Sequence, residues 1–89
     1  MGNQDSKMAV TIDRLVGEDF TLEVKEEDTV DSVKQMIYAL LNIEPNQQRL
    51  TYEGEMMIDD KTMAFYNIKE GSIIHLSIWS TESGALMEI

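Results

Sequence analysis

The hydrophobic period of this chain changes from two residues to 3.6 and back to two, and this change restricts the fold more than any other feature. Between residues 8 and 24, apolar and polar side chains alternate around a break near Gly17, which is typical of two half-buried strands joined by a turn. In the next segment the apolar residues fall on one face of a helix: Val30, Val33, Ile37 and Leu41. Alternation returns in three short runs, 49–52, 56–58 and 72–79. This order predicts an α+β domain in which a mixed sheet of four to five strands packs on one helix.

Polar residues and a proline mark the ends of the expected helix. Thr29 is a good N-cap, and the acidic residues just before it favour the positive end of a helix dipole. Asn42 suits the end of the helix, and Pro45 blocks its continuation. A further single helical turn is expected at residues 63–66.

The two ends of the chain follow neither period. Residues 1–7 are polar and aperiodic, which predicts a disordered lead-in, and the ordered domain is expected to span residues 8–80. Residues 81–89 are predicted to form a frayed C-terminal tail. Ala85, Leu86 and Met87 would also suit an extension of the last strand or a surface segment.

Charge and composition exclude several classes of function. There are 7 Lys and Arg against 17 Asp and Glu, and the net charge of −10 opposes binding to nucleic acid or to an anionic membrane surface. The chain has no cysteine and one histidine, and its residues show no spacing of a metal site or of a nucleophile with its base. We therefore expect no enzyme activity, metal, cofactor or small-molecule substrate. No apolar run reaches the roughly 20 residues of a membrane span, and a monomer in the cytoplasm and/or nucleus is expected.

Eight short segments follow one another with the order and spacing of a known family. They are TLEV (21–24), DTV (28–30), VK (33–34), P-x-QQRL (45–50), Gly54, DD-x-T (59–62), YNI (66–68) and S-x-x-HL (72–76). They resemble the ubiquitin family, and ubiquitin itself most closely, without a gap from about Met8 to Ser80. The resemblance implies the β-grasp fold, which agrees with the order of strands and helix inferred from the periods.

The resemblance also implies a core and two stabilising contacts. Lys34 is expected to pair with Asp59, and Tyr66 is expected to form a hydrogen bond with the backbone of the loop before Met63. The implied core residues are Met8, Val10, Ile12, Phe20, Leu22, Val24, Val30, Val33, Ile37, Leu50, Met57, Ile68, Ile74 and Leu76.

The tail departs from the pattern of a conjugated modifier. Such a modifier ends in two glycines, which thread a narrow enzyme cleft before the carboxylate is activated. The matching positions here hold Glu82 and Ser83, and a lone Gly84 follows them. The resemblance therefore favours a protein-interaction domain that is not conjugated; the alternative is a covalent modifier, or its precursor, that requires C-terminal processing.

A partner-binding face is implied where ubiquitin presents an apolar patch to its receptors. The matching positions are Leu15, Thr51 and Ser77, so two of the three apolar anchors have become hydroxyls. Losing them is expected to cost on the order of 2 kcal/mol of binding to ordinary ubiquitin receptors. The surrounding candidate residues for a partner from the ubiquitin pathway or an adaptor protein are Arg49, Gly54, Glu55, Met56, His75 and Trp79.

Trp79 stands where the family has a basic residue, and it is expected beside Arg49 and Met56. Trp and Arg are enriched at binding hot spots. The alternative is that Trp79 packs under residues 85–87.

Two further candidate sites lie elsewhere. Met36 and Leu40 are four residues apart on the expected outer face of the helix, with Tyr38 also outside, and they form a second candidate surface. The alternative is that Leu40 seals the edge of the core and Met36 is a scattered surface residue. The start MGNQDS fits N-myristoylation at Gly2, although one acyl chain without a basic cluster gives only marginal membrane attachment. The alternative is a cloned or linker-derived start.

Overall fold

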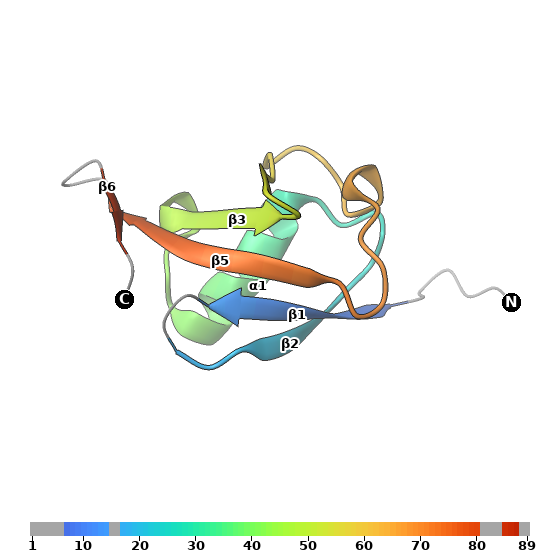
Figure 1. The fold of residues 1–89 in the computed structure, drawn as a ribbon, viewed down its shortest axis with the longest axis horizontal. Helices are drawn as coiled ribbons and strands as arrows, with labels where there is room; N and C mark the ends of the chain where they lie inside the picture. Colours follow the sequence, from blue (N-terminus) through green and yellow to red (C-terminus); the bar gives the residue numbers. More distant parts are fainter. Residues whose placement is uncertain (1–6, 15–16, 81–84, 88–89) are drawn as a thin grey trace, which may run out of the picture.

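The computed structural model describes residues 7–14, 17–80 and 85–87, and for Trp79, Ser80 and residues 85–87 it describes the backbone alone. Strands alternate with one long helix and two short 3₁₀ turns (Figure 1). In chain order the elements are β1 (Met8–Arg14), β2 (Phe20–Val24), α1 (Val30–Leu41), η1 (Pro45–Gln47), β3 (Gln48–Tyr52), β4 (Glu55–Met56), η2 (Ala64–Tyr66), β5 (Ile73–Ser80) and β6 (Ala85–Met87).

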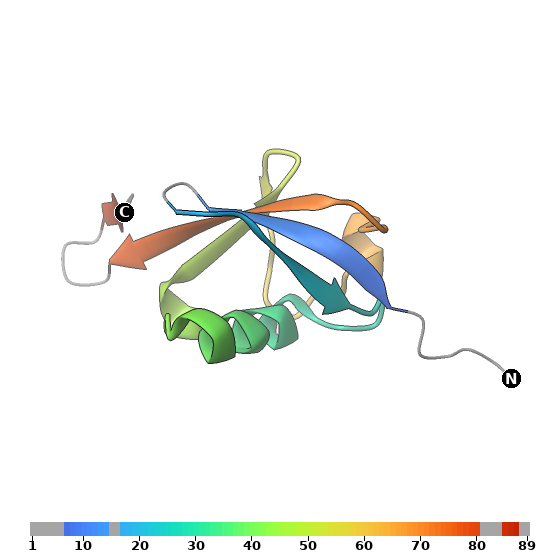
Figure 2. The same cartoon turned by 90° about the horizontal axis from the view of Figure 1, so that it is seen from below.

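The strands form one mixed sheet in the order β2-β1-β5-β3-β4. β1 and β5 run parallel in the middle of the sheet, whereas the pairs β1–β2, β3–β4 and β3–β5 are antiparallel. Figure 2 shows α1 lying across one face of this sheet. The predicted α+β arrangement of a mixed sheet on one helix is therefore confirmed.

The caps of α1 agree with the sequence. The side-chain hydroxyl of Thr29 accepts a hydrogen bond from the backbone N–H of Ser32 at 3.1 Å, which satisfies one of the free donors at the start of the helix. Asn42 ends the helix in the left-handed conformation, with φ 62°, and its N–H donates to the carbonyl of Tyr38 at 2.8 Å. Both ends of the helix are thus fixed by the residues predicted to fix them.

The core fills the space between α1 and the inner face of the sheet. All the core residues implied by the family resemblance are buried there except Met8 and Phe20, which are partly buried and pack against the core. Met63 is also fully buried, which the sequence did not indicate. A single 3₁₀ turn has no hydrophobic period, so the sequence pattern gave no signal that the residue preceding η2 points inward.

Two segments differ from the prediction. The fourth strand covers Glu55–Met56 rather than 56–58, and the side chain of Ile58 is 55% exposed. Ala85–Met87, expected as part of a frayed tail, instead form β6 and pair antiparallel with residues 78–80 of β5. β1 pairs only with residues 73–76 of β5, so β6 covers the part of the same β5 edge that extends beyond β1.

Candidate protein-binding surface

Strand register brings most of the predicted partner-binding residues onto one face of the sheet. Arg49 lies opposite Ser77, and Thr51 lies opposite both His75 and Met56. Directly paired residues of antiparallel strands point to the same side, and their chain neighbours Leu50, Ile74 and Leu76 are buried against α1. We call the side away from α1 the outer face and define it by Asp13, Arg49, Thr51, Met56, His75 and Ser77.

Of the six residues that define the outer face, five are polar and Met56 is apolar. Met56 is 55% exposed, His75 is exposed, and Arg49, Thr51 and Ser77 are partly buried. Glu55 and Gly54 are exposed in and beside the β3–β4 turn, where Gly54 takes a φ of 83°. These side chains bring apolar contact, hydrogen bonding and charge together over a small area.

One predicted residue is not described and another is described in part. Leu15 lies outside the described residues. Trp79 lies in β5, two residues beyond Ser77, and pairs by register with Leu86 of β6, while its side chain is not described. The expected contact of Trp79 with Arg49 and Met56 stays a prediction.

A contact that the sequence analysis missed joins two strands on the outer face. Nδ1 of His75 lies 3.1 Å from Oδ2 of Asp13, and both side chains are substantially exposed. The parallel pairing of β1 with β5 places the two residues opposite each other. Parallel register between distant segments leaves no local mark in a sequence, so only the family resemblance could have suggested this pairing.

The two contacts implied by the resemblance are present. Nζ of Lys34 donates to Oδ1 of Asp59 at 2.7 Å, and the Lys34 side chain is largely buried. The hydroxyl of Tyr66 accepts a hydrogen bond from the backbone N–H of Ile58 at 2.8 Å. These contacts attach the segment after β4 to the helix and to η2, so they stabilise the fold.

The second candidate surface is not one exposed pair. Leu40 is 59% exposed, but Met36 is partly buried and packs against the core. Tyr38 is exposed, as expected. The two residues therefore differ in burial: Met36 packs against the core, whereas Leu40 is largely exposed and is not among the residues packed against the core. Gly2 lies outside the described residues.

Three exposed apolar residues were missed, namely Ile58, Phe65 and Ile73. Ile73 could have been found from the alternation in the last strand, which places it on the same side as His75. Ile58 and Phe65 lie outside the regular elements or in a single 3₁₀ turn, where no period applies.

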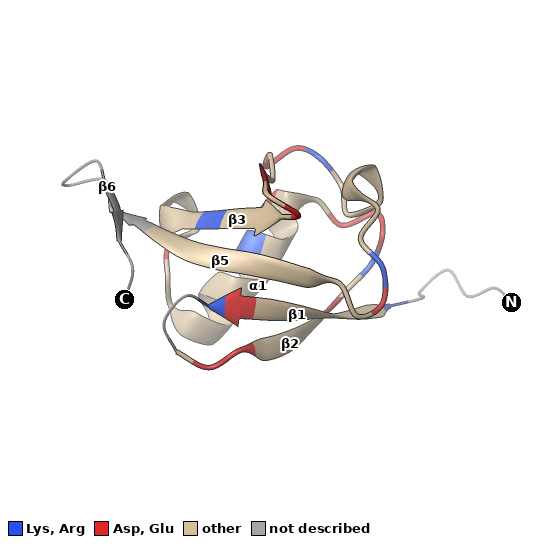
Figure 3. Cartoon of the chain, viewed as in Figure 1, with Lys and Arg blue, Asp and Glu red and all other residues tan. Residues whose placement is uncertain are grey.

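Charged residues are spread over the described segments (Figure 3). Acidic residues occur mostly in the connections between elements rather than on one face (Figure 3). The described part of the chain has no group of three or more His, Cys, Asp or Glu placed to hold a metal ion. None of its helices is long and apolar enough to cross a membrane.

The sequence matches a protein-family model over most of the chain. A model of the ubiquitin family matches residues 10–80. The chain belongs to the ubiquitin family, and its mixed sheet on one helix is the β-grasp fold of that family.

Individual relatives place the chain within the ubiquitin-like proteins. It is 35% identical over 69 residues to Ubiquitin-like protein 1 of Schizosaccharomyces pombe, an alignment that covers 78% of this chain and 88% of the relative. It is 32% identical over 69 residues to NEDD8-like protein RUB3 of Arabidopsis thaliana, with the same coverage. It is 34% identical over 71 residues to Ubiquitin-like protein 4A of Esox lucius, covering 80% of this chain and 46% of that protein. The match thus spans most of two relatives and about half of the third.

Proposed function

We propose that this chain is a ubiquitin-like protein-interaction domain, acting in the cytoplasm and/or nucleus, that binds a protein partner through the outer face and is not conjugated to it. The observation that carries the proposal is the composition of the outer face. Membership of the ubiquitin family favours a role in protein–protein interaction. Helix α1 covers the other side of the sheet (Figure 2), so the outer face is open, and it combines exposed Met56 with Arg49 and His75.

The outer face also argues for a partner other than the usual ubiquitin receptors. Thr51 and Ser77 present hydroxyls in the centre of the face, where the family resemblance implies apolar anchors. An apolar receptor surface would desolvate these hydroxyls without gaining hydrophobic contact. A partner that donates hydrogen bonds to Thr51 and Ser77 and places an apolar side chain against Met56 fits the face better.

Two features of the C-terminal region support the absence of conjugation. Glu82 and Ser83 occupy the positions of the two glycines that activation requires. In addition, β6 pairs antiparallel with β5, so the chain has reversed its direction by Ala85. An extended tail that enters an enzyme cleft would have to give up this pairing.

A thioester assay separates the proposal from the alternative of a covalent modifier. The protein is incubated with ubiquitin-family activating enzymes and ATP, before and after digestion by C-terminal hydrolases of the family. We expect no thioester under either condition, with ubiquitin as the positive control. A robust thioester would contradict the proposal and establish the modifier.

Affinity capture from cell extract tests the outer face itself. The variant Met56→Ala/His75→Ala is expected to lose the specific partner. Ile58→Ala is the matched control, because Ile58 is as exposed as Met56 but lies outside β4. Capture that survives the double variant, or that is lost equally in the control, would contradict binding through the outer face.

A further inference from the structure

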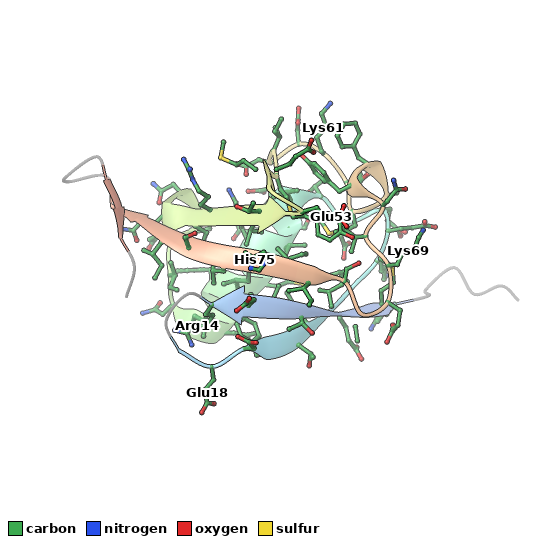
Figure 4. The ribbon with its side chains drawn as sticks, in the orientation of Figure 1. Arg14, Glu18, Glu53, Lys61, Lys69 and His75 are labelled. Carbon is green, nitrogen blue, oxygen red and sulfur yellow. The ribbon has the colours of Figure 1, made fainter. Side chains whose placement is uncertain are left out.

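A pocket of about 400 Å³ opens beside the β3–β4 turn, where that turn approaches η2. Figure 4 shows Glu53 at the end of β3, below the connection that carries Lys61. Three aromatic rings and two carboxylates line the pocket, and none of its lining residues is basic: Tyr52, Glu53, Glu55, Phe65, Tyr66 and Asn67.

The aromatic walls of the pocket are held in place before any ligand binds. The hydroxyl of Tyr66 accepts a hydrogen bond from the N–H of Ile58 at 2.8 Å, and the hydroxyl of Tyr52 lies 3.4 Å from that of Ser72. The ring of Phe65 meets the ring of Tyr66 edge to face, with 5.0 Å between centroids. A pre-organised wall reduces the entropy lost on binding, and Phe65 is 59% exposed, so its ring remains available for contact.

The chemistry of the pocket selects a cation. Nζ of Lys61 lies 4.9 Å from the centroid of the Phe65 ring, within the range of a cation–π interaction, so this ring attracts a cation and an arginine would have to use the ring surface that Lys61 leaves open. An apolar occupant would desolvate Glu53 and Glu55 without pairing them. An anion would be repelled both by these carboxylates and by the net charge of −10.

We propose that this pocket binds an arginine side chain from an extended segment of a partner protein. A guanidinium is planar and stacks on aromatic rings, and it pairs with carboxylates through two parallel hydrogen bonds. Tyr52, Phe65 and Tyr66 supply the rings, and Glu53 and Glu55 supply the carboxylates.

The surroundings of the pocket favour an arginine carried by a polypeptide over a free small cation. A second hollow of similar size shares Tyr52 and Glu53 with the pocket and continues to Ile73 and His75 on the outer side of the sheet. This hollow adds the carboxylate of Asp13. An extended segment that places arginine in the pocket can continue along it, and this site does not depend on binding at Met56.

The direct test is an NMR titration of the ¹⁵N-labelled protein with two peptides. One is acetyl-Gly-Ser-Arg-Ser-Gly-amide, and the other replaces arginine with citrulline, which keeps the planar shape and removes the charge. We expect saturable shifts of the amides of residues 52–56 and 65–67 with the arginine peptide, and binding at least about tenfold weaker with the citrulline peptide. Equal binding of the two peptides, or shifts centred elsewhere, would overturn the proposal.

Two variants test the rings and the carboxylates separately. Phe65→Leu keeps apolar bulk and removes the ring, and it is expected to weaken binding of the arginine peptide at least about threefold. Glu53→Gln/Glu55→Gln keeps the shape and removes both charges, and a loss of about tenfold is expected. Urea denaturation of each variant verifies that it is folded.

The control for charge is Glu18→Gln/Glu44→Gln, which removes two exposed carboxylates from other parts of the surface. Figure 4 shows Glu18 at the opposite edge of the sheet from Glu53. This variant has the same net charge as the pocket variant, and its affinity is expected to stay within about twofold of the original. If it weakens binding as much as the pocket variant, the peptide is attracted by overall charge and the pocket assignment is wrong.

Discussion

The two faces of the sheet follow different rules. On the inner face the side chains are mostly apolar and buried against α1. The buried polar residues of this layer have partners: Lys34 of α1 donates to Asp59, and the side chain of Gln48 donates to the carbonyls of Lys34 and Ile43. On the outer face, hydroxyls, charges and an exposed methionine stand side by side. The inner face must be apolar in every chain with this fold, because it forms the core with α1. The outer face has no such requirement, so its residues can differ from one family member to another and set the choice of partner.

The largest contrast is expected between two adjacent residues of β5. Ile74 is 0% exposed and faces α1, whereas Ile73 is 50% exposed on the other side. Ile74→Ala leaves a cavity in the core and is expected to lower the free energy of unfolding by about 2–5 kcal/mol. Ile73→Ala, the matched control, is expected to change it by about 0.5 kcal/mol or less. Urea denaturation followed by circular dichroism measures both.

A small effect of Ile74→Ala would show that the inner face is more loosely packed than its burial indicates. A large effect of Ile73→Ala would show that Ile73 contributes to stability and not to the outer surface alone. Either result would remove the distinction between the faces at this point of the sheet.

The outer face should respond in binding rather than in stability. Thr51→Ile/Ser77→Val restores apolar side chains at the two anchor positions, and the affinity for a general ubiquitin receptor is expected to rise about tenfold or more. Isothermal titration calorimetry with a ubiquitin-binding domain measures this change. Thr21→Ile on β2, far from the anchors, is the control and should leave affinity unchanged. If the double variant binds no better, the placement of the receptor surface at Thr51 and Ser77 is wrong.

The sequence predicted the inner side of the sheet better than the outer surface. Strands β1, β2, β3 and β5, the helix caps at Thr29 and Asn42 and most of the core were predictable, because each is a local period or a local hydrogen-bonding preference. The contact of Lys34 with Asp59 was predictable only through the family resemblance. These predictions did not require us to work out which distant segments of the chain lie next to each other.

The parts of the surface that the sequence did not reveal depend on such positions. The contact of Asp13 with His75 follows from the parallel register of β1 and β5. The aromatic pocket requires the β3–β4 turn and η2 to approach each other, and Phe65 lies in a single turn with no period of its own. The pairing of β6 with β5 depends on an edge left open where β1 ends.

Asp59 tests whether the polar contacts of the inner side contribute to stability. Asp59→Ala removes the carboxylate that accepts a hydrogen bond from Nζ of Lys34 at 2.7 Å. The ammonium is then left largely buried without this acceptor, and a loss of about 1 kcal/mol in the free energy of unfolding is expected. Asp60→Ala, at the exposed neighbouring position, is the control and should cost less than about 0.5 kcal/mol. Equal effects at the two positions would show that the ion pair adds no stability.

The smallest expected effect on stability is that of a substitution at Glu53, which also lines the proposed arginine pocket. Glu53 has a φ of 51°, in the left-handed region that disfavours a residue with a Cβ. Glu53→Gly relieves this strain and increases the entropy of the unfolded chain, so the net gain in stability is expected to be about 0.5 kcal/mol. The same change removes a carboxylate from the pocket, so arginine-peptide binding should weaken while stability rises. Glu53→Gln separates the two effects, because it keeps the strained backbone and the side-chain shape but removes the charge. If Glu53→Gly is less stable than the original protein, the Glu53 side chain makes a stabilising contact that outweighs the backbone strain, and the expected gain in stability is wrong.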